Sequence, residues 1–99
     1  MQVIFRTRQL QRNYEDPSRA VVDWGHAVGR HYIDRVDYLY EATDFNQLYD
    51  TRRLRLYPLR GSRTGQLSIY LTGRWRLIVT RGDTAQSIVL EEVSNHYDD

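Results

Sequence analysis

The sequence predicts an α+β fold with a short first strand and two helices packed on one face of a mainly antiparallel sheet of four to five strands. Two observations carry this expectation. Apolar residues in the first half recur at the helical period, whereas the second half alternates apolar and polar residues as half-buried strands do. Glycines separate the alternating segments where turns are required.

The helical half begins after a short strand at residues 3–5. Residues 7–14 are predicted to form a short helix. Asp16 followed by Pro17 marks the start of a second helix, because Asp caps free N–H groups and Pro suits the first turn. This helix is predicted to run to about Glu41. Its apolar side chains fall in an arc roughly 140° wide: Val21, Val22, Val28, Tyr32, Ile33, Val36, Leu39 and Tyr40.

Two glycines interrupt the long predicted helix. Gly25 and Gly29 both lie in its apolar arc. Each costs about 1 kcal/mol of helix propensity relative to alanine. We therefore expect a close approach of this helix to the sheet or to another helix.

The second half is predicted to be a meander of strands joined by glycine turns. The predicted strands are 53–57, 66–71, 74–77 and 87–93, and the predicted turns are 61–65, 72–73 and 81–83. Alternation places one set of apolar side chains against the helices: Leu54, Leu56, Leu67, Ile69, Leu71, Trp75, Leu77 and Val79.

Length and composition narrow the class of protein. A chain of 99 residues is predicted to form one domain, residues 1–99. The absence of cysteine excludes a disulfide scaffold, a thiol nucleophile and a cysteine-ligated zinc site. No apolar run approaches the roughly 18 residues of a membrane span, and the start does not look like a signal peptide. We expect a cytoplasmic protein without a membrane partner.

Charge is strongly segregated along the chain. The net charge is +1, and all 14 basic residues are arginine. Residues 52–82 contain eight arginines and no acid, whereas residues 83–99 contain five acids and no arginine. Codon usage accounts for the missing lysine but not for the missing acids. A segment with this excess of arginine is typical of phosphate binding.

Arginines and tyrosines share the predicted sheet face that turns away from the core. The strands place there Arg53, Arg55, Tyr57, Ser68, Tyr70, Arg74 and Arg76, and the first turn adds Arg60 and Arg63. Arginine clamps phosphate and tyrosine stacks on an unpaired base, so this face suits single-stranded RNA. The alternative is a solvated face whose arginines pair with the acids of the last strand and the tail. Glu91 and Glu92 are expected to pair with arginines rather than to act as a catalytic dyad.

Three histidines supply the residues that transfer protons near neutral pH. His26 and His31 are five positions apart, which does not form a metal pair on a helix, and we expect no catalytic role for either. His96 follows the last predicted strand. No phosphate loop, catalytic triad or zinc motif is present, so no metal site and no cofactor are predicted.

Three segments of the sequence resemble HigB-like toxins, the plasmid-maintenance killer branch of the RelE/ParE superfamily. Residues 54–66, LRLYPLRGSRTGQ, are similar to the family block R-x-HPLKGDRKGQ. Residues 71–78, LTGRWRLI, are similar to its NGxWRI strand, and residues 92–98 resemble its closing V-x-x-H segment. The resemblance covers nearly the whole chain in the family's order.

This resemblance implies a RelE-like fold and an mRNA endoribonuclease that acts in the ribosomal A site and is neutralised by a HigA-like helix-turn-helix antitoxin. Cleavage in such toxins uses the 2′-OH of the substrate as nucleophile. The catalytic positions implied here are His96 as acid or base, Arg76 as phosphate clamp, Arg60 as added charge and Tyr57 as orienting group. The residues expected to bind RNA, from their place on the arginine and tyrosine face, are Arg53, Arg55, Arg63, Tyr70 and Arg74.

The chain departs from the family pattern at two catalytic positions. Tyr57 stands where the block has histidine, and Arg60 stands where it has lysine. Arginine does not lose its proton in proteins, so these changes leave one histidine for proton transfer. A second function therefore stays open, that of a non-cleaving toxin that acts by binding a topoisomerase, RNA or the ribosome.

Overall fold

The structure, a computed structural model, describes residues 1–95. Within them the helices are α1 (Arg8–Glu15), α2 (Pro17–Trp24), α3 (His26–Glu41) and α4 (Phe45–Tyr49). The strands are β1 (Gln2–Phe5), β2 (Tyr57–Pro58), β3 (Leu67–Thr72), β4 (Trp75–Arg81) and β5 (Ser87–Ser94). Two short 3₁₀ helices, η1 (Arg52–Leu54) and η2 (Gly61–Arg63), flank β2. The α+β class is confirmed.

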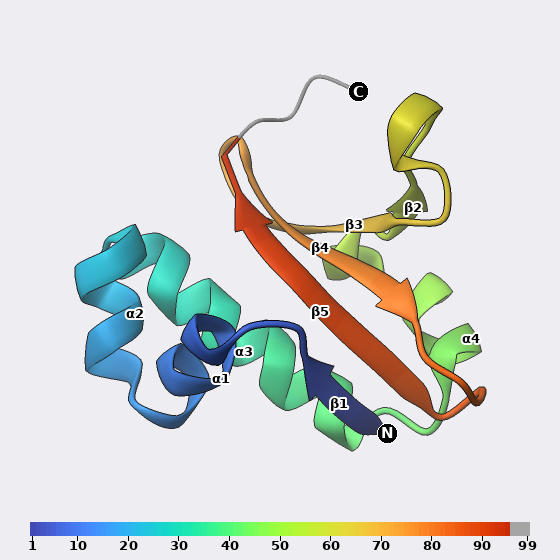
Figure 1. The fold of residues 1–99 in the computed structure, drawn as a ribbon, viewed down its shortest axis with the longest axis horizontal. Helices are drawn as coiled ribbons and strands as arrows, with labels where there is room; N and C mark the ends of the chain where they lie inside the picture. The colour runs from blue at the N-terminus through green and yellow to red at the C-terminus, as the bar shows by residue number, and fades with distance from the viewer. Residues whose placement is uncertain (96–99) are drawn as a thin grey trace.

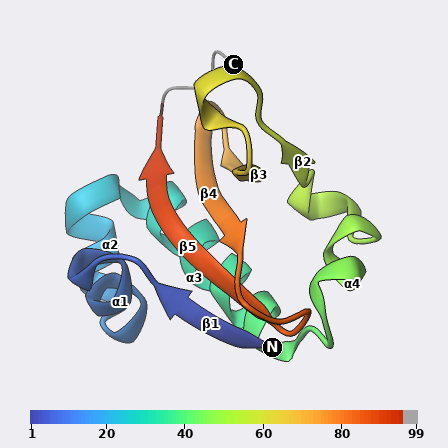
Figure 2. The same ribbon diagram turned by 45° about the vertical axis from the view of Figure 1, so that its right-hand side comes forward.

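The strands form one mixed sheet in the order β1-β5-β4-β3-β2 (Figure 1). β1 pairs with β5 in parallel, and the other three pairs are antiparallel. The sheet is therefore mainly antiparallel, as the sequence predicts. α1 and α2 lie beyond one edge of the sheet, whereas α4 and β2 lie toward the other (Figure 2).

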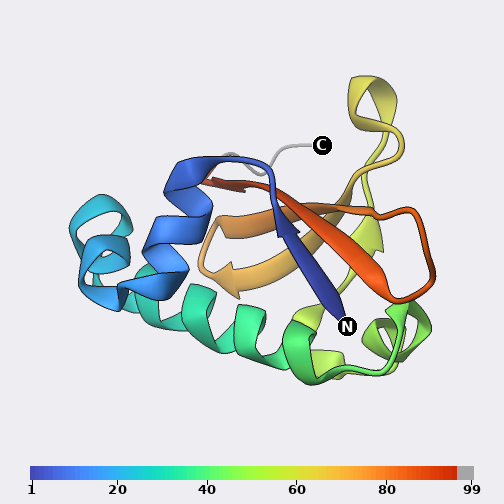
Figure 3. The same cartoon turned by 60° about the horizontal axis from the view of Figure 1, so that its bottom comes forward.

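One face of the sheet packs on α3, which runs along it (Figure 3). Tyr32, Val36 and Leu39 of α3 are fully buried there. Their partners in the core cluster include Ile69, Leu71, Leu77, Val79, Ile88 and Leu90. Most of the apolar set expected to face the helices is buried, although Leu56 and Trp75 are only half-buried. η2 stands on the opposite side of the sheet from α3 (Figure 3).

The long helix expected from residue 17 to 41 is wrong, because Gly25 divides it into α2 and α3. Gly25 has a φ of +88°, a backbone conformation that side-chain-bearing residues rarely adopt. The expected start and end are confirmed: Asp16 accepts a hydrogen bond from Ser18 N–H, and α3 ends at Glu41. The break rotates Val22 out of the arc, and its side chain is 80% exposed.

Gly29 accounts for the expected close approach. A methyl group at Gly29 would lie 3.1 Å from Ala20 C and 3.1 Å from Val21 N, both backbone atoms of α2. The missing side chain therefore lets α2 and α3 pack at short range, as two helices rather than as a helix on the sheet.

The strand expected at residues 53–57 is also wrong. Residues 52–54 form η1, Arg55 is left-handed with a φ of +47°, and only Tyr57 and Pro58 pair with β3. An alternation of five residues is satisfied equally well by a tight turn that buries Leu54. Arg53 and Arg55 are therefore on a turn and not on a strand.

Candidate nucleic-acid interface

The sheet face turned away from α3, here called the outer face, carries the predicted binding residues of β2, β3 and β4. Register places Tyr57, Ser68, Ile78 and Glu92 in one row across four strands. Tyr70, Arg76 and Ser94 form the next row. Directly opposite residues of neighbouring strands share a face, so these rows lie side by side.

Tyr70 lies at the centre of a group of cations on the outer face. The guanidinium carbon of Arg55 is 4.5 Å from the centre of the Tyr70 ring, and that of Arg76 is 4.9 Å from it. Both distances are typical of cation–π contacts. Tyr70, Arg55 and Arg76 are called the Tyr70 cluster below. The left-handed conformation of Arg55 brings its side chain to this cluster despite the absence of the expected strand.

Arg76 is fixed in this cluster by hydrogen bonds to the backbone. Its Nη1 donates to the carbonyl oxygen of Gly73 at 2.8 Å and to that of Trp75 at 2.9 Å. Tyr70 is fixed in the same turn, because its hydroxyl accepts a hydrogen bond from Gly73 N–H at 3.1 Å. A guanidinium held in this way is oriented before any anion arrives, which favours binding of phosphate.

The loop after β2 brings Arg63 into the same surface. Arg63 Nη2 is 3.0 Å from Glu92 Oε2, so this arginine is paired with an acid of the last strand, as the alternative interpretation of the face expects. Arg60 and Arg74 have exposed side chains, and within residues 1–95 neither makes an ion pair. The outer face therefore combines neutralised and unneutralised arginines.

Three residues of the row through Tyr57 are buried or half-buried although they belong to the outer face, whereas Glu92 at the end of the row is exposed. Tyr57 is half-buried, and Ser68 opposite it is fully buried. The hydroxyl oxygen of Ser68 has no hydrogen-bond partner among the described residues. Ile78, the next residue in this row, is buried as well.

Arg53 lies away from the outer face. Its guanidinium is 3.8 Å from an oxygen of Asp34 and stacks 5.2 Å from the ring centre of Tyr38, both on α3. The turn at η1 sends Arg53 and Arg55 to different sides, whereas a strand would have placed them together. The expected placement of Arg53 beside Arg55 on the outer face is corrected accordingly.

The expectation that Glu91 and Glu92 pair with arginines is confirmed. Arg6 donates from Nε and Nη2 to the two carboxylate oxygens of Glu91, each at 3.0 Å, and Thr80 Oγ1 donates to Glu91 at 2.6 Å. The hydrogen bond from Arg6 lowers the pKa of Glu91, and the bond from Thr80 acts in the same direction.

The histidines are divided between α3 and the end of the chain. His96, the predicted proton-transfer residue, lies outside the described residues. His26 and His31 belong to α3 and line a hollow of about 560 Å³ together with Arg30, Asp34 and Arg53. Neither lies in the Tyr70 cluster.

Arg35 is the residue of this region that sequence reasoning missed. It is 6% exposed, and its Nε donates to the carbonyl oxygen of Tyr70 at 3.0 Å. A signal existed, because Arg35 stands three positions after Tyr32 and seven after Val28, directly beside the edge of the apolar arc. An arginine at a buried helical position needs a polar partner, and here that partner is the backbone of β3.

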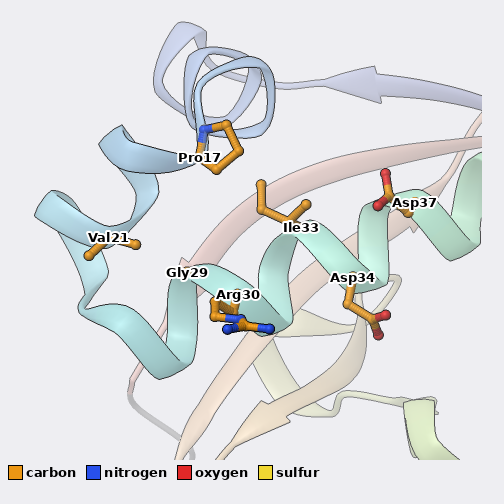
Figure 4. Close-up of a pocket in the computed structure, with 7 residues that line it drawn as sticks. All are labelled: Pro17, Val21, Gly29, Arg30, Ile33, Asp34 and Asp37. Carbon is orange, nitrogen blue, oxygen red and sulfur yellow. The ribbon is translucent and has the colours of Figure 1, made fainter.

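A separate hollow of about 310 Å³ lies between α2 and α3. It is lined by Pro17, Val21, Gly29, Arg30, Ile33, Asp34 and Asp37 (Figure 4). In residues 1–95 no three His, Asp or Glu side chains are grouped so as to hold a metal ion. None of the helices in this part of the chain has the length and apolar character of a membrane span.

Comparison with solved structures finds the same fold in toxins. A YoeB/ParE toxin from Agrobacterium tumefaciens aligns with a TM-score of 0.59 and 17% identity, over 98% of this chain and 100% of that chain. The YoeB-YefM complex from Staphylococcus aureus aligns with a TM-score of 0.62 and 18% identity, over 98% of each chain. No protein-family model and no curated protein sequence matches this one. The chain therefore has the fold of YoeB/ParE toxins, as the resemblance to the RelE/ParE superfamily predicts.

Proposed function

We propose that this protein is the toxin of a type II toxin-antitoxin system and cleaves mRNA in the ribosomal A site. The observation that carries the proposal is the Tyr70 cluster on the outer face of this fold, where two guanidinium groups lie within 5 Å of one aromatic ring. Arginine and tyrosine together provide charge for phosphate and an aromatic surface for an unpaired base. The sequence resemblance to HigB-like toxins supports the same proposal.

The residues divide the chemistry of cleavage among them. The 2′-OH of the RNA attacks the adjacent phosphorus, and the bond to the 5′-oxygen of the next nucleotide breaks. Arg76, held by two carbonyl groups, stabilises the negative charge that develops on the phosphate oxygens. His96 accepts the proton of the 2′-OH and returns it to the leaving 5′-oxygen, Tyr57 orients the 2′-OH, and Arg60 adds charge beside the phosphate.

The remaining predicted residues bind the RNA on either side of the reacting phosphate. Arg55 and Tyr70 belong to the cluster itself, Arg74 lies in the turn that holds Arg76, and Arg63 reaches the outer face from η2. Arg53 lies beside α3 and contacts a more distant phosphate in this proposal. In this proposal no cofactor is needed to supply the nucleophile, because the nucleophile is the 2′-OH of the substrate RNA.

An antitoxin is the proposed protein partner. One of the similar solved structures is a complex, that of YoeB with YefM. For this chain we propose a HigA-like helix-turn-helix protein that is encoded beside it and acts in the cytoplasm. A pull-down with this chain as bait is expected to recover a small DNA-binding protein from the adjacent gene.

A second function, toxicity by binding without cleavage, is favoured by one observation. Within residues 1–95 the outer face carries arginines and tyrosines but no histidine, because both described histidines lie on α3. A toxin of this kind binds a topoisomerase, RNA or the ribosome and leaves mRNA intact.

Induced expression in a bacterial host separates the two functions. For the nuclease, we expect growth arrest and new mRNA 5′ ends within codons in the reading frame. Arg76→Ala and His96→Ala are expected to relieve the arrest, whereas Arg19→Ala, which removes an exposed arginine of α2, leaves it unchanged. Intact mRNA with DNA damage supports the second function instead. Full toxicity of both variants contradicts the assigned site.

A further inference from the structure

The buried guanidinium of Arg35 is an unusual feature of the region beneath the outer face. Its side chain is 7% exposed, although a charged group loses its hydration on burial and then requires polar partners. Two partners are present. Arg35 Nη1 lies 2.8 Å from Asp34 Oδ2, and Arg35 Nε donates to the Tyr70 carbonyl oxygen at 3.0 Å.

Arg35 meets β3 where the sheet restrains it least. β2 pairs only with Leu67 and Ser68, so within residues 1–95 β3 has no strand partner on that edge at Tyr70. On the other edge the register with β4 shifts between Tyr70 and Thr72, as in a β-bulge. The bond from Arg35 therefore ties this irregular part of the strand to α3.

Tyr70 connects the backbone that Arg35 holds with the arginine side chains of the outer face. Its backbone carbonyl accepts from Arg35, while its ring contacts Arg55 and Arg76 and its hydroxyl binds Gly73 N–H. The ring therefore touches both guanidinium groups and belongs to the residue whose backbone is held by α3.

Asp34 extends the same network to the turn that carries Arg55. Its carboxylate binds Arg35 at 2.8 Å and lies 3.8 Å from Arg53. Arg55 follows Arg53 by two residues, at the end of η1. One pair of α3 residues therefore anchors both the strand that carries Tyr70 and the turn that carries Arg55.

We infer that Arg35 is a positioning residue for RNA binding: it fixes the backbone of Tyr70 from beneath the sheet and so sets the spacing of Arg55 and Arg76 for phosphate. This inference rests on the proposed function of the outer face. Displacement of binding groups by about 1 Å is enough to cost up to a hundredfold in a preorganised site.

The test combines Arg35→Lys with Tyr70→Ala and measures the affinity of a single-stranded RNA oligonucleotide by fluorescence anisotropy. Lysine keeps the charge but lacks the planar Nε donor, so we expect RNA binding to weaken on the order of tenfold. In the Tyr70→Ala background the same change is expected to have no further effect, because Arg35 acts through Tyr70. Arg30→Lys, an exposed position on the same helix, is the matched control and leaves the affinity unchanged.

A structural readout keeps this inference separate from the proposed function. In Arg35→Lys the ring protons of Tyr70 are expected to shift in NMR spectra and to lose their contacts with Arg55 and Arg76. An unchanged Tyr70 ring, or losses of affinity that simply multiply in the double variant, overturns the inference. A displaced ring in a protein whose wild type binds no RNA supports the positioning of Tyr70 and overturns the proposed function.

Discussion

Arg63 of η2 and Glu92 of β5 form an ion pair of 3.0 Å that joins the loop after β2 to the last strand. The same guanidinium donates from Nη1 to Gln66 Oε1 at 2.8 Å. Glu92 is the acid that neutralises an arginine of the outer face, while Arg60 and Arg74 have no such partner within residues 1–95. The pair therefore sets how much positive charge this face presents.

Glu92→Gln is expected to strengthen RNA binding. The change removes the charge that neutralises Arg63, and we expect an affinity gain of about three- to tenfold at low salt that shrinks as salt rises. The urea midpoint of unfolding stays nearly unchanged, since exposed ion pairs contribute about 1 kcal/mol or less. Affinity measured at two salt concentrations checks this.

Glu41→Gln is the matched control, because it changes the net charge equally at the exposed end of α3. Equal gains from the two variants mean that RNA responds to overall charge rather than to the outer face. A loss of affinity in Glu92→Gln contradicts the prediction and shows that the pair serves to orient Arg63.

The pair of Arg6 and Glu91 gives a stability that depends on pH. Arg6 and Thr80 hold the pKa of Glu91 below its ordinary value. A lowered folded-state pKa stabilises the protein above the unfolded-state value of about 4.3, and this contribution is lost as pH falls through the folded-state value. Arg6→Ala should therefore lower the urea midpoint at pH 7 and have a smaller effect at pH 3.

Arg8→Ala controls for the loss of one arginine from the same segment, since Arg8 is exposed and makes no ion pair within the described chain. The urea midpoint of Arg8→Ala should equal that of the wild type at both pH 3 and pH 7. A deficit in Arg6→Ala that is the same at pH 3 and pH 7 assigns the effect to packing of the Arg6 side chain and not to its charge.

The sequence was sufficient for the fold class and for the strands with partners on both sides. β3 and β4 follow their alternation because each lies within the sheet, where alternation decides which side chains are buried. At residues 53–57 the same alternation fails, since the segment lies at the edge and a 3₁₀ turn buries Leu54 equally well. The break at Gly25 depends on a positive φ that no residue pattern reports.

The candidate site was partly predictable for the same reason. Tyr70 and Arg76 lie on adjacent strands, so alternation alone placed them together. The left-handed turn at Arg55 brings the Arg55 side chain to the Tyr70 ring. The same turn places Arg53 beside Asp34 of α3, away from Tyr70 and Arg76. Arg35 was not found because a single charged residue beside the edge of an apolar arc can either turn to solvent or bind a buried carbonyl, and only the neighbouring backbone decides between these.

Gly29→Ala is expected to destabilise the protein, although alanine favours helices. The new methyl group would meet the backbone of Ala20 and Val21 at 3.1 Å beside the hollow in Figure 4. Overpacking against backbone costs about 1–3 kcal/mol, which exceeds the gain of about 1 kcal/mol from propensity. Thermal unfolding should show a lower Tm.

Ala27→Gly measures the propensity difference by itself, because Ala27 is exposed on the same helix. Comparison of the two variants separates the effect of helix propensity on Tm from the effect of the contact between residue 29 and α2. A higher Tm for Gly29→Ala would mean that α2 moves aside without cost, and the close approach would then not explain the glycine.

Tyr32→Phe is expected to lower stability through a single hydrogen bond. Tyr32 is fully buried, and its hydroxyl donates to the carbonyl oxygen of Leu10 in α1 at 2.7 Å. Loss of a buried hydrogen bond costs about 1 kcal/mol, which corresponds to about 4–8 °C in Tm for a domain of this size. Tyr40→Phe, at an exposed tyrosine of the same helix, should leave Tm unchanged.

The cost of Tyr32→Phe should also depend on pH. Burial raises the pKa of Tyr32 above its ordinary value, so the native state keeps this phenol neutral after the unfolded chain has begun to ionise it. A raised folded-state pKa stabilises the protein below pH of about 10 and destabilises it progressively above. Phenylalanine does not ionise, so the difference between wild type and Tyr32→Phe should narrow between pH 8 and pH 11. A constant difference over this interval would mean that the Tyr32 hydroxyl ionises equally in the folded and unfolded states, which contradicts the pKa shift expected from its burial.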